Sequence, residues 1–403
     1  MQDSFGNTVT TASTDALRLI EAAIDMHARA WPGALDAAQG ATREDPELAI
    51  AHALEGLIHA MWGRRSAADA CISRARASAA RVSAREISLL ELLEHVVRGR
   101  THAGLAWLLA HLRRFPADLL ALTTGMGAYG LFAFSGRADH NELRLALLDE
   151  LEPCYPPDFP WLLAYRGWAR IEFGAVDEGL AMVFRAIGLR PQNAHNAHMI
   201  AHGLYEARLP AQYLAFLSEW LPCYSEDALM WGHLQWHAAI AELELGDEDS
   251  ALERCVSQLM ANLPKFAPFM ALADGSSIMW RLGLRGRTAL PWARAAQHAR
   301  DHFPNGTNAF GEVHLAMVAA ASRDPEALSL CAQRLERLAS EGYCGARAAL
   351  KWVAAVNALL VGRQDEAERF FEDCEAQAVR LGGSHAQRSI ISETRRARQL
   401  PAI

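Results

Sequence analysis

The chain has 403 residues, of which 51% are hydrophobic and 21% charged, so it can bury a large core and is neither disordered nor collagen-like. It has 39 lysines and arginines against 47 aspartates and glutamates, a formal net charge of -8. This balance argues against a nucleic-acid partner. No run of 18 residues is free of charged or turn-forming residues, so no membrane partner is expected either.

The start of the chain and its cysteines point to one compartment. Residues 1–6 lack the basic and apolar regions of a signal peptide. The seven cysteines are scattered and form no CxxC pair, so we expect reduced thiols that mostly fill the core. Reduced thiols are typical of cytosolic proteins, and the sequence therefore predicts a cytoplasmic location.

Helical periodicity runs through most of the chain. Apolar residues recur at intervals of three and four, as residues 86–97 illustrate, and alternating strand-like patterns are nearly absent. A repeat of about 34 residues accompanies this periodicity, which is typical of tetratricopeptide helix pairs. In that pattern small residues let the paired helices approach, glycine makes the turn, and proline ends the second helix. The fitting positions are Gly56, Gly63, Ala68, Ile72 and Ala75, then Gly167, Gly174, Val183, Ala186 and Pro191, with partial fits at Gly99, Leu108 and Pro116, at Ala239, Gly246, Ala251 and Cys255, at Ala355, Gly362, Ala367, Phe371 and Cys374, and at Ala327 and Cys331.

Two stretches between the clear repeats are irregular. Residues 115–160 and 262–310 are rich in glycine and proline but also carry large apolar residues that need burial. We interpret them as helical pairs with long connections. The sequence therefore predicts an all-α fold, a tetratricopeptide-like right-handed superhelix of antiparallel helix pairs (an α-solenoid), as a single domain over residues 1–403.

Two pairs of histidines are the main candidates for a functional site. His198 with His202, and His233 with His237, are four residues apart. On a helix this spacing places both imidazoles on one face, near enough to share a metal or a substrate. The repeat places His198, His202 and His233 at positions that face the concave surface. The alternative is that such pairs are surface or core residues without a further role.

The known histidine and nucleotide motifs are absent. Neither pair is part of HExxH, so the zincin signature is missing, and so are the zinc-deaminase signature, the nucleotide-binding glycine loops and the GxSxG elbow. By the repeat count Trp168, Glu172 and Glu312 also face inward, and His314 lies toward the edge of the same helix as Glu312.

These residues belong to strings that resemble the tetratricopeptide repeat protein 38 family over nearly the whole chain. The most specific string is GGSHAQR at residues 382–388, for which a plain repeat protein has no packing need. The other similar strings are DSFGN at residues 3–7 with Thr10, NAHNAHMIAH at 193–202, HLQWH at 233–237 with ELELG at 242–246, Asp274 with WRL at 280–282, and FGEVH at 310–314. The family is named for its fold, and the resemblance implies that polar residues from several repeats line one internal channel.

The chain departs from the family pattern at a few positions. Tyr205 stands where the family carries Glu, and Glu206 follows one position later, which implies an altered chemistry or a different substrate. Residues 234–235 are Leu-Gln where Asn and an aromatic residue are usual, and Glu312 stands where the family tends to have Asp. The chain ends at residue 403 where relatives continue with another helical pair. An open apolar end of this kind predicts a homodimer.

Imidazoles beside carboxylates are the usual equipment of general acid–base catalysis. The same donors suit Zn²⁺, Mn²⁺ or Fe²⁺, so a divalent metal is a possible cofactor. The candidate catalytic residues are His198, His202, His233, His237, Asp274, Glu312, His314 and His385. The ligands of a metal, if one binds, are His198, His202 and His233. The candidate substrate-binding residues are Arg388, Gln387, Trp168, Glu172, Tyr205, Glu206 and Trp236.

Several of these candidates have structural alternatives. Arg388 could hold a carboxylate or phosphate by bidentate hydrogen bonds, or it could pair with Glu393. Asp274 could be a helix N-cap, and His385 could cap the helix that begins near it. The tryptophans could form an apolar wall or ordinary packing between repeats.

Two classes of function follow. The first is an enzyme that acts on a small polar molecule by acid–base or metal-assisted chemistry, through hydrolysis, elimination or isomerisation and without a nucleotide cofactor. The second is a scaffold that binds a peptide or partner protein in a concave groove. The inward positions, rich in histidine and carboxylate, favour the first. We expect His198, His202, His233, Asp274 and His385 to converge within one cavity.

Overall fold

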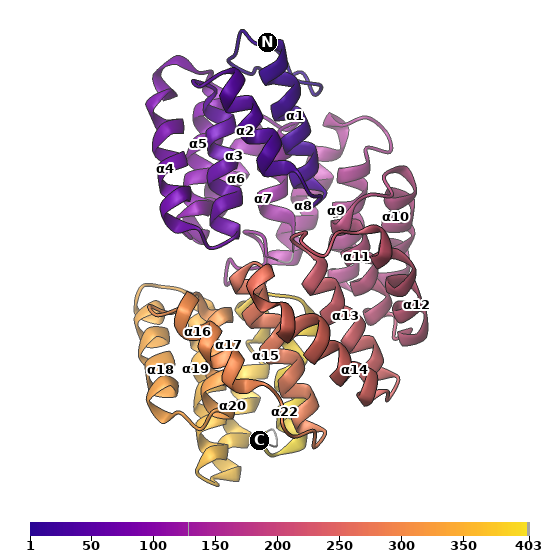
Figure 1. The fold of residues 1–403 in the computed structure, drawn as a ribbon, viewed down its shortest axis with the longest axis vertical. Coiled ribbons are helices and arrows are strands. Elements are labelled where there is room, and N and C mark those ends of the chain that lie inside the picture. The colour runs from indigo at the N-terminus through magenta and orange to yellow at the C-terminus, as the bar shows by residue number, and fades with distance from the viewer. Residues whose placement is uncertain (128, 401–403) are drawn as a thin grey trace. The chain divides into compact units, whose positions relative to one another are not determined.

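The computed structural model describes residues 1–127 and 129–400. These residues form α-helices joined by loops and short 3-10 turns. The described part contains no β-strand, only an isolated bridge between Gln2 and Thr8. Consecutive helices pack as pairs, for example α3 with α4 and α9 with α10 (Figure 1). The predicted class, an all-α fold of tetratricopeptide-like helix pairs, is confirmed.

Contacts divide the helices into two compact units. Unit 1 comprises residues 1–132, 141–203 and 227–230, and unit 2 comprises residues 133–140, 204–226 and 231–403. The prediction of a single superhelical domain concerns how such units are joined, and it stays a prediction.

The helices of the first half of the chain are short and of similar length. They are α1 (Thr14–Ala28), α2 (Ala34–Glu44), α3 (Ala49–Met61), α4 (Arg65–Ala77), α5 (Ala84–Val97), α6 (Thr101–Arg114), α7 (Leu119–Met126), α8 (His140–Leu151), α9 (Pro160–Phe173), α10 (Val176–Leu189) and α11 (Ala194–Glu206).

The second half continues in the same way. Its helices are α12 (Pro210–Trp220), α13 (Trp231–Glu244), α14 (Glu248–Arg254), α15 (Pro268–Leu284), α16 (Trp292–His302), α17 (Ala309–Ala321), α18 (Pro325–Ser340), α19 (Cys344–Leu360), α20 (Gln364–Glu375), α21 (His385–Arg388) and α22 (Ile390–Ala397). The irregular stretches contain α7 and α8, and α15 and α16. The interpretation of these stretches as helical pairs with long connections stays a prediction.

The repeat positions have the roles that packing predicts. Gly174 ends α9 with φ of 97°, a left-handed conformation that lets the chain turn sharply into α10. A Cβ on Gly167 would lie 2.6 Å from Val183 Cγ2 and 2.8 Å from the carbonyl oxygen of Gly179. The backbones of α9 and α10 are therefore close enough that only glycine fits at this crossing.

Replacing each of two glycines of α10 by alanine should change the free energy of unfolding in opposite directions. A Cβ on Gly179 would lie 2.5 Å from the Gly167 carbonyl oxygen, whereas nothing lies within 4 Å of a Cβ on Gly188. We expect Gly179→Ala to lower the free energy of unfolding by about 1–3 kcal/mol through overpacking. Gly188→Ala should raise it by about 0.4–1 kcal/mol, because alanine restricts the unfolded chain. Urea unfolding of both variants tests this, and equal shifts would contradict the close approach of the two helices.

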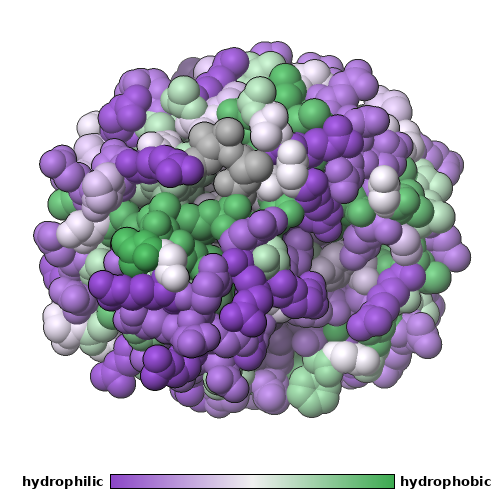
Figure 2. Space-filling model, turned by 90° about the horizontal axis from the view of Figure 1, so that it is seen from below, coloured by the Kyte–Doolittle hydropathy of each residue, from purple (hydrophilic) through white to green (hydrophobic). Residues whose placement is uncertain are grey.

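The described surface alternates between hydrophilic and hydrophobic areas. Seen from below, one face shows hydrophobic residues gathered in an area bordered by hydrophilic ones (Figure 2). Among the described residues, no helix combines the length and the apolar character needed to cross a membrane.

Candidate functional site

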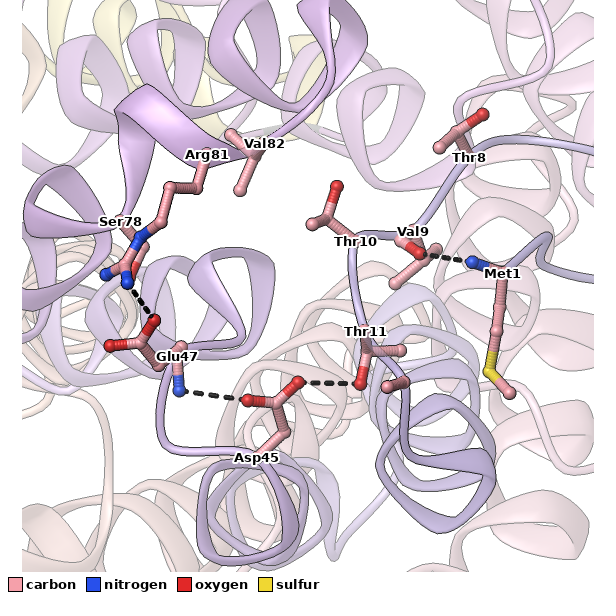
Figure 3. Close-up of a pocket in the computed structure, with 11 residues that line it drawn as sticks. Met1, Thr8, Val9, Thr10, Thr11, Asp45, Glu47, Ser78, Arg81 and Val82 are labelled. Atoms are coloured by element: carbon pink, nitrogen blue, oxygen red, sulfur yellow. Dashed lines mark hydrogen bonds and ion pairs between the residues drawn. The ribbon is translucent and has the colours of Figure 1, made fainter.

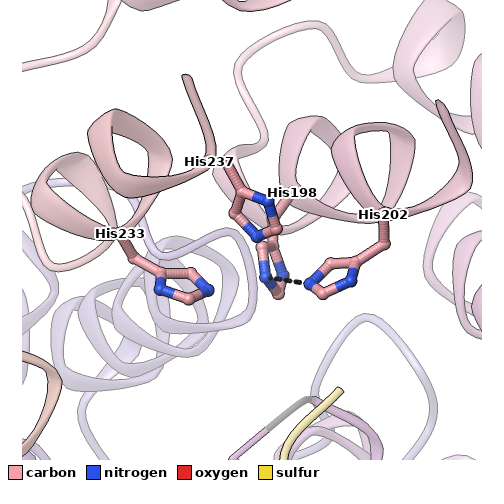
Figure 4. Close-up of side chains that lie close together, drawn as sticks. All are labelled: His198, His202, His233 and His237. Atoms are coloured by element: carbon pink, nitrogen blue, oxygen red, sulfur yellow. Dashed lines mark hydrogen bonds between the residues drawn. The ribbon is translucent and has the colours of Figure 1, made fainter. Parts of the chain in front are cut away.

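Two helices bring four imidazoles together. His198 and His202 lie one turn apart on α11, and His233 and His237 lie one turn apart on α13. Their exposed fractions are 0–3%. One ligand atom from each ring lies within 4.8 Å of those of the others. Figure 4 shows the four imidazole rings close together. The two pairs found in the sequence therefore form one group, which we call the four-histidine cluster.

The α11 pair is closely coupled. His202 Nε2 and His198 Nε2 are 2.8 Å apart, so one ring donates a hydrogen bond and the other accepts it. The rings are perpendicular, with centroids 4.4 Å apart. Trp168 of α9 contacts both rings. It stacks on His198 with ring centroids 5.8 Å apart and meets His202 edge-on with ring centroids 4.8 Å apart. Trp168 thus forms an apolar wall beside this pair.

The α13 pair is oriented by a buried carboxylate. His233 Nδ1 donates a hydrogen bond of 2.8 Å to Asp274 Oδ1, and Asp274 is 3% exposed. Burial raises the pKa of Asp274, and the neighbouring His233 acts against that rise. Asp274 lies within α15 and is not its N-cap. The bond fixes the ring so that Nε2 is the nitrogen that carries the lone pair.

The fourth ring, His237, has a partner that the sequence did not single out. The hydroxyl of Tyr213 on α12 forms a short hydrogen bond with His237 Nδ1. Burial raises the pKa of Tyr213 well above its ordinary value, so the group stays a neutral hydroxyl. Trp236 stacks on His233 with centroids 5.3 Å apart and donates from Nε1 to Ser277 Oγ at 2.8 Å. No sequence motif marks Tyr213, because its role depends on a contact between α12 and α13.

The four-histidine cluster has the composition of a transition-metal site. Imidazole nitrogens suit zinc, iron and manganese, and metal-ligating histidines typically use their second ring nitrogen to bond a carboxylate or another polar group. Asp274 and Tyr213 occupy such positions at His233 and His237. If two ring nitrogens each lie about 2.1 Å from one ion and the two bonds meet at a right angle, the nitrogens are about 3 Å apart. The Nε2 atoms of His198 and His202 have nearly this separation.

The most specific sequence string has a different place. His385 begins α21, its side chain is 62% exposed, and its Nδ1 lies 3.1 Å from Glu206 Oε1. The Tyr205 hydroxyl donates to Ser389 Oγ at 3.3 Å. The Tyr205 and His385 rings meet edge to face, with their centroids 6.1 Å apart. The structure places His385 beside Glu206, and its convergence with His198, His202, His233 and Asp274 stays a prediction.

Gln387 and Arg388 have local hydrogen bonds that explain their positions. Ser384 is the N-cap of α21, and Gln387 completes the capping box by accepting from the Ser384 backbone N–H at 2.9 Å. Arg388 Nη1 donates to the Gly383 carbonyl oxygen at 2.5 Å. Both residues lie within α21, and these bonds hold the helix to the turn that precedes it. Their role in substrate binding stays a prediction, and the S-x-x-Q spacing itself indicates a capping box.

A buried arginine that sequence reasoning did not include in the site holds this string. Arg281 Nε lies 3.0 Å from Glu393 Oε1, and its Nη2 donates to the Ala386 carbonyl oxygen at 2.8 Å and to Ser389 Oγ at 3.1 Å. These bonds of Arg281 fix α21 and α22 against α15.

Glu244 is another titratable group close to Arg281. Burial raises the pKa of Glu244 to about 7, the charge of Glu393 raises it further, and the charge of Arg281 lowers it.

Glu312 and His314 on α17 are held by their own surroundings. Glu312 Oε1 accepts from the Thr307 backbone N–H at 2.7 Å, and Arg334 Nη1 lies 3.8 Å from its Oε2. Burial raises the Glu312 pKa. His314 Nδ1 donates to the Phe310 carbonyl oxygen at 2.8 Å, and burial lowers its pKa to about 4. These contacts stabilise the start of α17, and neither residue belongs to the four-histidine cluster.

Glu172 lies one turn after Trp168 on α9 and is half-buried. Its backbone carbonyl oxygen accepts from Asn141 Nδ2 at 3.2 Å. This bond ties α9 to α8 and gives no indication of a substrate contact.

A separate pocket of 490 Å³ lies at the N-terminal segment and contains none of the predicted site residues (Figure 3). Its polar groups bond one another: Thr11 Oγ1 donates to Asp45 Oδ2 at 2.6 Å, and Arg81 pairs with Glu47 at 2.5 Å. Such mutual pairing satisfies these groups without a ligand. The lining consists of Met1, Thr8, Val9, Thr10, Thr11, Ala12, Asp45, Glu47, Ser78, Arg81 and Val82.

Comparison with known proteins gives remote structural likenesses. No protein-family model matches the chain. The chain is similar to a Rap protein complexed with competence and sporulation factor, with a TM-score of 0.43 and 13% identity over 83% of this chain and 98% of that one. It is also similar to the TPR domain of P58(IPK), with a TM-score of 0.25 and 12% identity over 95% and 98% of the two chains. For Naa15/Naa10 bound to HypK-THB the TM-score is 0.25, with 10% identity over 90% and 58%.

Proposed function

We propose that the four-histidine cluster binds one divalent transition-metal ion and that this ion supports chemistry on a small polar molecule. The observation that carries the proposal is the approach of four buried imidazoles whose ligand atoms lie within 4.8 Å of one another. His237 is thereby added to the three ligands that the sequence suggested. Imidazole nitrogens are common ligands of transition metals, and one ion could take a lone pair from each of the four rings.

The ligand set bears on the choice among zinc, manganese and iron. Four imidazoles complete the tetrahedral shell that zinc prefers in structural sites. Manganese and iron accept more ligands, which leaves positions for water or substrate. A catalytic role in hydrolysis, elimination or isomerisation therefore favours Fe²⁺, because imidazole nitrogens suit iron whereas manganese prefers oxygen ligands. In such a site the chain's own groups hold the ion and exclude water, with Asp274 orienting His233 and with Trp168 and Trp236 as apolar walls.

The proposal also includes a family and a location in the cell. Membership of the tetratricopeptide repeat protein 38 family is supported by the tetratricopeptide-like helix pairs and the strings described above. A cytoplasmic location is supported by seven free cysteines.

Metal content tests the proposal directly. After dialysis against Mn²⁺, Fe²⁺ or Zn²⁺, elemental analysis should find one more equivalent of metal in the wild-type protein than in His202→Ala, because loss of one ligand should weaken binding at least tenfold. His302→Ala is the matched control, because His298 and His302 have the same spacing on α16 but His302 is exposed. Equal metal content in wild type and His202→Ala would overturn the proposal.

The alternative function is a scaffold that binds a peptide or partner protein. The tetratricopeptide-like helix pairs support it, since such stacks commonly bind peptides. A chain without metal at the four-histidine cluster, with unchanged stability in His202→Ala, would favour this alternative.

A further inference from the structure

A second group of residues that could bind a metal ion lies on the helix pair α3–α4. Glu55 and His59 of α3 and Cys71 of α4 each offer a ligand atom, and these atoms lie within 4.8 Å of one another. The group contains a thiol, an imidazole and a carboxylate, and it shares no residue with the four-histidine cluster.

Local packing explains why the three residues meet. Glu55 and His59 are one turn apart on α3, so their side chains share a face. Gly56 lies between them, and a Cβ there would be 3.2 Å from the Ile72 side chain. The small residue lets α4 approach α3 closely, and Cys71 Sγ consequently lies 3.9 Å from Glu55 Oε2.

Glu55 is a buried carboxylate that, among the described residues, has no lysine or arginine in an ion pair with it. It is 5% exposed, and its Oε1 accepts a hydrogen bond of 3.0 Å from Thr42 Oγ1. Within the described ranges no lysine or arginine forms an ion pair with it, and the nearest cationic candidate is His52 Nδ1 at 3.9 Å. Burying an ionised carboxylate is costly unless it is paired or coordinates a metal. A bound cation would supply the missing charge.

His59 offers a nitrogen of the right kind. Its Nδ1 is buried and has no hydrogen-bond partner among the described residues. Burial lowers the His59 pKa, and the guanidinium of Arg64 lowers it further. The ring is therefore neutral near pH 7, which is the form that binds metals.

Cys71 completes a set of three donors. It is 2% exposed, and burial raises its thiol pKa, with Glu55 adding to the rise and Arg74 opposing it. Arg74 Nη2 donates to Cys71 Sγ at 3.1 Å, a contact that favours the thiolate. Metal coordination deprotonates such a thiol and releases its proton to solvent.

We propose that Glu55, His59 and Cys71 bind one Zn²⁺ ion that links α3 to α4. Sulfur, nitrogen and oxygen donors together suit zinc, and three protein ligands leave the fourth tetrahedral position for water. Manganese, with its preference for oxygen ligands, suits this set less well.

Cobalt substitution tests this site separately from the four-histidine cluster. Titration of the full chain with Co²⁺ should produce a thiolate-to-cobalt charge-transfer band in the near ultraviolet that saturates once the site at Cys71 is filled. Cys71→Ser should abolish the band. Cys374→Ser, which changes another buried cysteine, should keep it. His202→Ala should keep it as well, because the four-histidine cluster has no sulfur ligand.

Two results would overturn the zinc site. One is the absence of the band in the wild-type chain, and the other is its persistence in Cys71→Ser. If Cys71→Ser does not fold by circular dichroism, His59→Ala replaces it, because His59 is only partly buried. His59→Ala should weaken Zn²⁺ binding, measured by competition with a chromophoric chelator, by at least tenfold. Unchanged affinity in His59→Ala would reject the proposal.

Discussion

Arg85→Ala is expected to lower the free energy of unfolding by about 3–5 kcal/mol, because it leaves a buried carboxylate without its cation. Arg85 Nε lies 2.7 Å from Asp118 Oδ2, and the two side chains are 5% and 1% exposed. Arg85 also donates from Nη1 to the Thr8 carbonyl oxygen at 3.0 Å, which ties the N-terminal segment to α5. The variant loses both the ion pair and this anchor.

Chemical unfolding measures the effect, with Arg81→Ala as the control. Arg81 pairs with Glu47, but both side chains are about 60% exposed, and exposed pairs contribute at most about 1 kcal/mol. Similar losses in the two variants would show that burial of the Arg85–Asp118 pair contributes little.

Acid pH should reduce the difference between wild type and Arg85→Ala. Burial alone would raise the Asp118 pKa, but the His111 hydrogen bond and the Arg85 charge outweigh it and lower the pKa from 3.8 to about 2. A pKa lower in the folded state contributes stability above the unfolded value, and this is lost as pH falls from about 4 to about 2. Unfolding curves of both proteins across this range check the sign.

The fold was predictable where its determinants are local. Gly174 at the end of α9 and Gly167 at the helix crossing act through neighbours a few residues away in the repeat, so spacing alone identifies them. Helical periodicity is equally local, as the agreement of residues 86–97 with α5 shows. The division into two contact units had no signal in the sequence, because it depends on contacts between distant segments.

The candidate site was only partly predictable. Spacing within α11 and α13 placed each histidine pair on one face, and the repeat pattern suggested that the pairs meet. Tyr213 escaped notice because a lone tyrosine in an apolar helix resembles core packing until its partner is known. Asp274 was assigned to the site, with an N-cap as the alternative, and the structure places it in mid-helix against His233.

For residues 382–388 the family resemblance predicts a functional motif, because the string is unusual. The spacing of Ser384 and Gln387 predicts a helix capping box instead, and the structure contains that capping box. In contrast, Glu55 and His59 have the same spacing as the histidine pairs and were not noticed. Their third partner, Cys71, is supplied by α4, so no single helix shows the complete set.

Asp274→Asn is expected to weaken metal binding at the four-histidine cluster by 10–100-fold, if that cluster binds a metal as we propose. The aspartate accepts the His233 Nδ1 proton at 2.8 Å, which directs the lone pair of Nε2 toward the other rings and makes the ring a stronger ligand. Asparagine has nearly the same shape but no charge. If its amide group donates to Nδ1, the ring takes the other tautomer and Nε2 carries a proton that blocks coordination.

Metal dissociation constants should be measured for wild type, Asp274→Asn and Ser277→Ala. The comparison distinguishes the orientation of the His233 ring by Asp274 from a general effect of altered packing on α15. Ser277 lies on the same helix and accepts from Trp236 instead of a histidine, so its loss should leave metal affinity within about twofold. A tenfold loss corresponds to about 1.4 kcal/mol of binding free energy. Comparable affinity in wild type and Asp274→Asn would mean that the buried carboxylate only satisfies a hydrogen bond. A loss confined to Asp274→Asn, at unchanged thermal stability, would identify the carboxylate as the group that sets the ligand strength of His233.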